Sequence, residues 1–124
     1  MNFNIFNTRE AKDDDLNFIL NSWLKSNRHN YSHIDNDTYY RQYKNHVVEL
    51  LQNSVTLIAC SEEDPDHIYG YITFEDGIMH YLYIKYTFRK MGMGTELIEI
   101  SGCKQASIKT NLLPAFNNLH LLRQ

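Results

Sequence analysis

The clearest chemical signal in the chain is carried by Arg89, Gly92 and Gly94, within the stretch YLYIKYTFRKMGMGTELIEI. A run of aromatic and β-branched residues, typical of a strand, leads directly into the two glycines and then into a helix-like segment. The first N–H groups of a helix lack intrahelical partners and carry the positive end of its dipole, so anions bind there. Glycine lets the backbone approach a phosphate closely, and Lys85, Arg89 and Lys90 form the main basic cluster next to the glycines. The sequence therefore predicts a phosphate-binding loop over residues 89–95.

The spacing excludes two common nucleotide-binding loops. A Walker loop ends in Gly-Lys followed by Ser or Thr, and this stretch has no such ending. The dinucleotide fingerprint needs a third glycine and a parallel βαβ setting, and neither is found here. The remaining pattern is Arg-x-x-Gly-x-Gly at the start of a helix.

Hydrophobic spacing predicts the elements that come before this loop. Residues 3–9 alternate as a first strand, and three aspartates then precede an amphipathic helix. The apolar face of that helix consists of Leu16, Ile19, Leu20, Trp23 and Leu24. A second helix is predicted over residues 37–52, and a buried strand over 55–60.

The strongest local signal is a hairpin, IYGYITFEDGIMHYLYIKY, whose two β-rich runs flank Asp76-Gly77. That pair is favoured in a two-residue type I′ turn. A helix over about 92–101, a short strand in QASIK and a last helix in NLLPAFNNLHLL complete the expected order. Residues 1–124 are thus expected to form one α/β (α+β) domain, with a mostly antiparallel central sheet flanked by helices.

Composition restricts the class of function. The net charge of −3 argues against a nucleic-acid binder. No apolar run approaches a membrane span and the N-terminus lacks a signal-peptide pattern, so a cytoplasmic protein is expected. Cys60 and Cys103 are predicted to be reduced core thiols. The histidines do not form a metal-ligand pattern, so no metal is expected.

The stretch LYIKYTFRKMGMGTELIE resembles the acetyl-CoA motif of the GNAT family, the GCN5-related N-acetyltransferases. In that family a hydrophobic strand is followed by Arg/Gln-x-x-Gly-x-Gly/Ala and a helix, and the match runs from Leu82 to Leu97. The segment FNTREAKDDDLNFILNSW is similar to the family's first strand and helix, and the element order fits over about residues 1–120. The resemblance implies the acyl-CoA N-acyltransferase fold, and transfer of an acetyl group to an amine of a small molecule or a protein.

The resemblance also implies a set of cofactor contacts. In the family, the pantetheine arm of acetyl-CoA pairs with exposed backbone groups of the strand before the loop, which here are those of Leu82, Tyr83 and Ile84. One strand N–H near Ile84 would polarise the thioester carbonyl. The pyrophosphate would bind amides of the loop. The loop residues are Arg89, Lys90, Met91, Gly92, Met93, Gly94 and Thr95.

His80 is the candidate catalytic base. Some family members carry the base on this strand, and strand alternation is expected to place His80 on one face with Leu82 and Ile84. A histidine can accept a proton near neutral pH. The alternatives are a hydrogen-bonded sheet residue without a catalytic role, and Glu75 as the base.

The remaining candidates have simpler readings. Trp23 and Tyr43 are expected in the core or the cleft wall. The polar connector that contains Arg28, His29 and His33 either borders the acceptor site, as in the family, or is a solvated loop.

The sequence departs from the family pattern near its end. The segment TNLLPAFNNLHLLRQ contains no tyrosine, which many members use as the general acid, and two C-terminal strands are expected to be missing. Either these strands are absent, or a second copy or another protein supplies them, or the fold is a reduced version. The alternative function is therefore a catalytically silent GNAT-like binding or structural module, for example a phage protein that assembles with partners in the host cytoplasm.

Overall fold

The structure is a computed structural model that describes residues 6–106 and 120–121. Six strands form its sheet: β1 (Phe6–Glu10), β2 (Val55–Ser61), β3 (Ile68–Glu75), β4 (Ile78–Ile84), β5 (Gln105–Ala106) and β6 (His120–Leu121). The helices are α1 (Leu16–Ser26), α2 (Asn36–Thr38), α3 (Lys44–Gln52) and α4 (Met93–Ser101). Short 3₁₀ turns at Asp13–Asp15, Arg28–Tyr31 and Tyr86–Phe88 connect them, and a π-helical turn at Tyr39–Tyr43 joins α2 to α3. None of the helices in these two ranges has both the length and the apolar character needed to cross a membrane.

The strands lie in sequence order, β1-β2-β3-β4-β5-β6. The first four are antiparallel to their neighbours, while β5 runs parallel to β4 and β6 parallel to β5. This arrangement confirms the predicted mostly antiparallel sheet.

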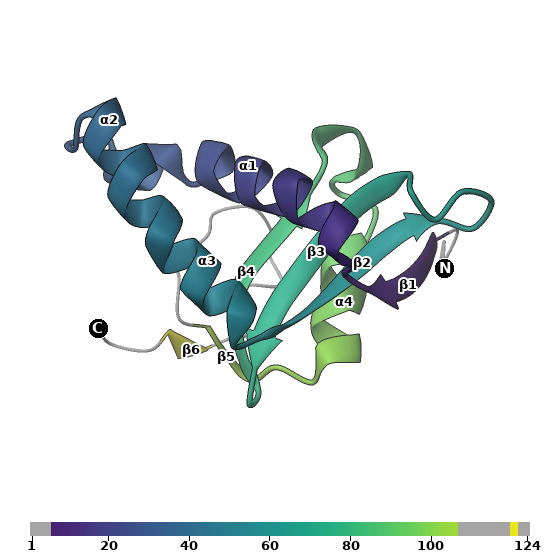
Figure 1. The fold of residues 1–124 in the computed structure, drawn as a ribbon. Helices are drawn as coiled ribbons and strands as arrows, with labels where there is room; N and C mark the ends of the chain where they lie inside the picture. Colours follow the sequence, from purple (N-terminus) through teal and green to yellow (C-terminus); the bar gives the residue numbers. More distant parts are fainter. Residues whose placement is uncertain (1–5, 107–119, 122–124) are drawn as a thin grey trace.

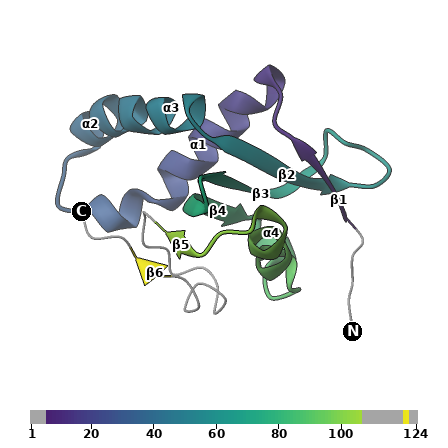
Figure 2. The same cartoon turned by 90° about the horizontal axis from the view of Figure 1, so that it is seen from below.

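Helices cover both faces of the sheet, with α1 and α3 on one side and α4 on the other (Figures 1 and 2). The hydrophobic core accordingly consists of two clusters, one on each face of the sheet. Trp23, Val47, Tyr71 and Tyr81 belong to the cluster beneath α1 and α3. The opposite cluster beneath α4 includes Ile72, Met79, Leu82, Ile84, Met93 and Leu97. Cys60 and Cys103 are buried free thiols, one in each cluster, as expected.

The β3–β4 hairpin forms as predicted. Asp76 and Gly77 connect the two strands with φ values of 51° and 77°, the positive pair that a type I′ turn requires. The helix expected over 37–52 is also present, because α2, the π-helical turn and α3 follow one another over residues 36–52. Its cap is Asp35, whose side chain accepts a hydrogen bond from the Thr38 N–H at 3.2 Å.

The C-terminal segment matches the sequence prediction only in part. Gln105 and Ala106 form the expected strand in QASIK. Most of the segment predicted as a last helix lies outside the described residues. At its end, His120 and Leu121 are strand β6 and not helix.

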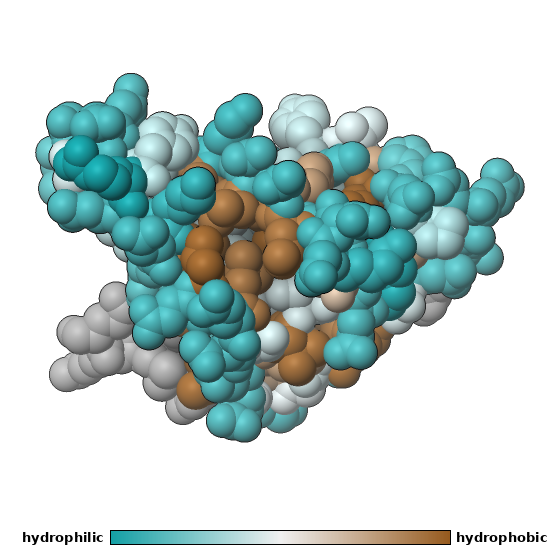
Figure 3. Space-filling view, viewed as in Figure 1, coloured by the Kyte–Doolittle hydropathy of each residue, from teal (hydrophilic) through white to brown (hydrophobic). Residues whose placement is uncertain are grey.

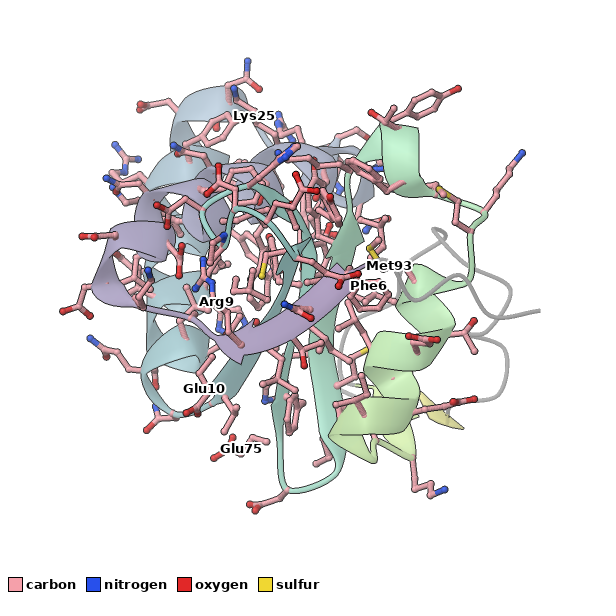
Figure 4. The ribbon with its side chains drawn as sticks, turned by 90° about the vertical axis from the view of Figure 1, so that its right-hand side faces the viewer. Phe6, Arg9, Glu10, Lys25, Glu75 and Met93 are labelled. Atoms are coloured by element: carbon pink, nitrogen blue, oxygen red, sulfur yellow. The ribbon has the colours of Figure 1, made fainter. Side chains whose placement is uncertain are left out.

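A buried ion pair fixes the start of α1 against β1. Arg9 on β1 donates to both carboxylate oxygens of Asp15, at 2.7 and 3.1 Å, and the Lys12 N–H donates to the same carboxylate at 2.8 Å (Figure 4). Asp15 is only 5% exposed. The hydrogen bond from Arg9 holds the pKa of the Asp15 carboxyl below its usual value.

We expect Arg9→Met to lower the free energy of unfolding by about 2–4 kcal/mol, because it leaves a buried carboxylate without its cation. Urea denaturation at pH 7 measures this change. The lowered pKa of Asp15 means that the pair stabilises the fold above the unfolded-state pKa of about 4, and that this contribution is lost as the pH falls through the lower folded-state pKa. An Asp15→Asn variant should therefore lose less stability than the parent on acidification.

The matched control for this prediction is Arg41→Met. Arg41 pairs with Asp37 at 3.2 Å, but both side chains are mostly exposed. Its loss should change stability by less than about 1 kcal/mol. Equal effects of the Arg9 and Arg41 substitutions would show that the buried pair does not anchor α1.

Candidate active site

Strands β4 and β5 run parallel beside the β3–β4 hairpin turn. Within the described residues they pair only at Ile78 with Gln105 and at Met79 with Ala106. The Lys104 N–H donates to the Gly77 carbonyl at 2.9 Å, so the pairing starts at the hairpin turn. Figure 1 accordingly shows β5 beside the hairpin end of β4.

The backbone of β4 presents further hydrogen-bonding groups after Met79. The Lys85 N–H donates to the Tyr69 carbonyl at 2.8 Å, which sets the phase of the β3–β4 ladder. In an antiparallel ladder, alternate residues bond to the neighbouring strand. Tyr83 therefore directs its N–H and carbonyl toward β3, whereas Leu82 and Ile84 direct theirs to the opposite edge of β4, the edge on which β5 pairs. Of the three residues proposed to pair with pantetheine, two have backbone groups on the required side.

A loop with two left-handed residues follows β4. Lys90 has φ 65° and Gly92 has φ 82°. Left-handed positions of this kind turn successive N–H groups inward, and such concave backbone binds anions. The first α-helical hydrogen bond of α4 runs from Glu96 N–H to the Gly92 carbonyl, so the N–H groups of residues 93–95 precede the helical ladder.

The space beside the loop is open. A Cβ added at Gly92 would meet no atom within 4 Å. Lys90, Met91 and Thr95 are also exposed, with Met91 at 46%. Met93 and Gly94 are buried, and Met93 packs in the same cluster as Phe6, close to it in Figure 4. The exposed loop is thus fixed to the core by its own next residue.

Arg89 connects the loop to β4. Its Nε donates to the Ile84 carbonyl at 2.8 Å, and its guanidinium lies 5.7 Å from the centre of the Tyr86 ring. Lys85, predicted to add to the same cationic cluster, instead places its ammonium 5.2 Å from the ring centre of Phe18 on α1. The charge at the start of α4 therefore comes from Arg89 and Lys90.

The strand alternation that predicts His80 on the face of Leu82 and Ile84 is interrupted within β4, so this placement stays a prediction. Thr73 pairs with Tyr81 while the next residue, Phe74, pairs with Met79, so His80 is the extra residue of a β-bulge. The bulge breaks the alternation, and Met79 lies in the hydrophobic cluster beneath α4.

His80 instead lies close to Glu75 at the hairpin. It is 8% exposed, and its Nε2 lies 3.6 Å from Oε1 of Glu75, whose side chain is 44% exposed. The two candidates for the base therefore form one pair that extends from the interior to the surface. Met79, next to His80, pairs with Ala106 of β5, so His80 and Glu75 lie beside the described part of the β4–β5 pairing.

Several other candidates have structural roles. Trp23 is buried and stacked on Tyr81 at 4.7 Å between ring centres, as expected of a core residue. Arg28 donates to the Ile34 carbonyl and to Asn36 within the connector, which makes it a local brace. Burial raises the pKa of Tyr81 to about 12, so this tyrosine stays protonated at neutral pH. No group of three metal-ligating side chains lies within the described residues.

A cavity of about 440 Å³ adjoins the loop, and the sequence prediction missed it. Its lining residues are Phe18, Asn21, Ser22, Lys25 and Ser26 of α1 together with Tyr83 and Arg89. Their spacing of three and four along α1 was the available signal, because they form the stripe beside the apolar face. The pattern alone does not show that this polar stripe faces β4.

Comparison with known proteins places this arrangement in a fold class. No family model matches the sequence, and no curated protein matches it by sequence similarity. Solved structures do match. The chain is similar to apo YjaB from Escherichia coli, with a TM-score of 0.60 and 18% identity over 82% of this chain and 69% of that one. It is also similar to a GCN5-related N-acetyltransferase from Rhodopseudomonas palustris, with a TM-score of 0.58 and 15% identity over 82% of this chain and 66% of that one.

A third similar structure is the PaiA N-acetyltransferase from Thermoplasma acidophilum in complex with coenzyme A. The TM-score is 0.56 at 14% identity, over 90% of this chain and 84% of that one. The protein therefore has the GNAT fold. The first two matches extend over only about two-thirds of the similar proteins.

Proposed function

We propose that this chain is an acetyl-CoA-dependent N-acetyltransferase that acts on an amine of a small molecule or a protein. The observation that carries the proposal is the continuity of two features along one strand. On the side away from β3, β4 presents the backbone groups of Leu82 and Ile84, and it then leads into the open, glycine-containing start of α4. A long cofactor with a diphosphate at one end fits that combination.

In this proposal the diphosphate binds the helix start and the pantetheine arm follows β4. The N–H groups of residues 93–95 donate to the diphosphate, and Arg89 and Lys90 supply positive charge. The outward backbone groups of Leu82 and Ile84 pair with the amides of the arm. Tyr83 contributes its side chain, because its backbone faces β3. Met91 flanks the loop on its exposed side.

The proposed chemistry is acyl transfer. The amine nitrogen attacks the thioester carbonyl, a C–N bond forms, the C–S bond breaks, and the sulfur leaves as a thiolate that takes up a proton. The proton of the attacking amine goes to His80. The Glu75 carboxylate, whose Oε1 lies 3.6 Å from Nε2 of His80, then accepts this proton or orients the imidazole. The location of His80 and Glu75 beside the described β4–β5 pairing supports this role.

A second candidate, a catalytically silent GNAT-like binding module, is favoured by the burial of His80. Transfer distinguishes the two candidates. Calorimetry with acetyl-CoA, followed by free-thiol release against a panel of amines, should show binding and amine-dependent release. Binding without release across the panel would favour the module.

Acetyl-CoA affinity should also weaken with added salt, because the cofactor phosphates face Arg89 and Lys90 at an exposed loop. Screening shortens the Debye length from about 10 Å at 0.1 M to about 3 Å at 1 M ionic strength. Titrations over this range in the parent and in Lys90→Met should show a smaller salt dependence in the variant. An affinity that does not change with salt would mean that the phosphates bind elsewhere.

A further inference from the structure

The cavity between α1 and the end of β4 has an unusual charge for this protein. The chain carries a net charge of −3, yet the cavity is lined by two cations, Lys25 and Arg89, and by no carboxylate. Figure 4 shows Lys25 on α1, at the same upper side of the view as the turn that follows β4. Two cations at one cavity repel each other, and an anionic group bound between them offsets that repulsion.

The acidic residues of this region lie at a separate cavity. Asp14, Asp15 and Asp66 line a space on the other side of Phe18, together with Lys85. Lys85 also lies over the Phe18 ring. The ring is part of both cavity walls, so it divides the cationic space from the acidic one.

The cations of the first cavity have no acidic partner among the residues that the structure describes. Among the described residues, neither Lys25 nor Arg89 forms an ion pair with a carboxylate, whereas Arg9, Lys12 and Arg41 do. Arg89 uses its Nε for the Ile84 carbonyl. Its position is thus fixed, while the charge of both side chains remains available for an anion.

The polar wall of the cavity is rigid. Ser22 contacts the Tyr71 hydroxyl at 2.8 Å, and Ser26 contacts the Tyr81 hydroxyl at 2.6 Å. These bonds tie α1 to β3 and β4, so the distance between Lys25 and the end of β4 is set by the fold. A ligand that reaches both cations therefore needs no movement of α1.

We infer that this cavity binds the acceptor through an acidic group, so that the substrate is an amine that also carries a carboxylate or a phosphate. The inference rests on the proposed acetyl transfer. Arg89 stands between the phosphate loop and the cavity, and Tyr83 belongs to the strand proposed to hold the cofactor. Lys25 then serves the acceptor alone, and it sets the preference for acidic amines over neutral or dicationic ones.

The test measures binding and needs no turnover. The probes are 5-aminopentanoate, pentylamine and 1,5-diaminopentane, which share a carbon chain length and differ in the far group. Their affinities are obtained from NMR shifts of the Asn21 and Tyr83 amides, with coenzyme A present so that the probes are not acetylated during the titration. We expect 5-aminopentanoate to bind roughly tenfold more tightly than pentylamine, the range of a hydrogen bond to a charged group, and diaminopentane to bind weakest.

Substitutions of Lys25 complete the test. Lys25→Met should remove the advantage of the carboxylate, Lys25→Glu should make diaminopentane the tightest of the three, and Lys44→Met, at an exposed lysine of α3, should change nothing. Equal affinities of the three probes in the parent would overturn the inference. A loss of acetyl-CoA affinity in Lys25→Met that disappears with 3′-dephospho-CoA would also overturn it, because Lys25 would then bind the cofactor. If the probe order holds but no thiol is released, the proposed transfer fails and the anion site stands.

Discussion

Replacing Gly92 with valine should abolish measurable acetyl-CoA binding, with an affinity loss of roughly 100-fold or more. The open space beside Gly92 is where the diphosphate is proposed to lie, and a valine side chain would occupy it. Valine also resists the φ of 82° that Gly92 adopts, so the loop that turns its N–H groups toward the anion would change shape. Calorimetry with acetyl-CoA measures the change.

The other end of the same helix offers a matched control. Gly102 follows α4 with φ 73°, and a Cβ added there would also meet no atom within 4 Å. Gly102→Val therefore imposes a similar backbone strain at a position remote from the proposed diphosphate. The two variants should lose similar stability, but only the Gly92 variant should lose the cofactor. Equal affinity for acetyl-CoA in both would remove the phosphate loop from the proposal.

His80→Ala should slow acetyl transfer by roughly 100- to 10,000-fold, the usual range for loss of a positioned base. Affinity for acetyl-CoA should stay within about twofold of the parent value, because backbone amides and Arg89 hold the cofactor in this proposal. Rates are measured by thiol release under saturating amine.

Glu75→Gln separates the base from its partner. It keeps the shape of the Glu75 side chain and removes the charge that lies 3.6 Å from His80. A smaller loss of rate than in His80→Ala is expected of a residue that orients the base. A His80→Ala variant as fast as the parent would exclude the histidine and leave Glu75, water or a neutral amine in solution as the source of deprotonation.

The elements that could be predicted from the sequence are those whose conformation is determined by residues close together in the chain. Asp76 and Gly77 adopt positive φ values at a low energetic cost, so these two residues were enough to predict the hairpin turn. The helix start at Met93 follows from Gly92, and its apolar residues Leu97 and Ile98 are buried as their spacing predicts. The Arg-x-x-Gly-x-Gly pattern was informative for the same reason, because its residues shape the loop through contacts with residues only a few positions away in the sequence.

What the sequence could not predict depends on pairing across the sheet. His80 looks like any other residue of an alternating strand, and only the register of β3 against β4 shows that a bulge sits there. Lys85 looked like a partner of Arg89, but the direction of its side chain is set by Phe18 on a distant helix. The cavity beside α1 depends likewise on which helix face turns toward β4.

The most direct test of the central claim is an amide NMR titration of the chain with acetyl-CoA. The account predicts saturable shifts concentrated at two places: the loop and helix start over residues 90–95, and Leu82 and Ile84 on β4. The α1–α3 groove that includes Leu16, Leu20 and Leu51, visible as an apolar hollow in Figure 3, should remain unchanged. Shifts confined to that groove, or no saturable shift at millimolar cofactor, would contradict the account.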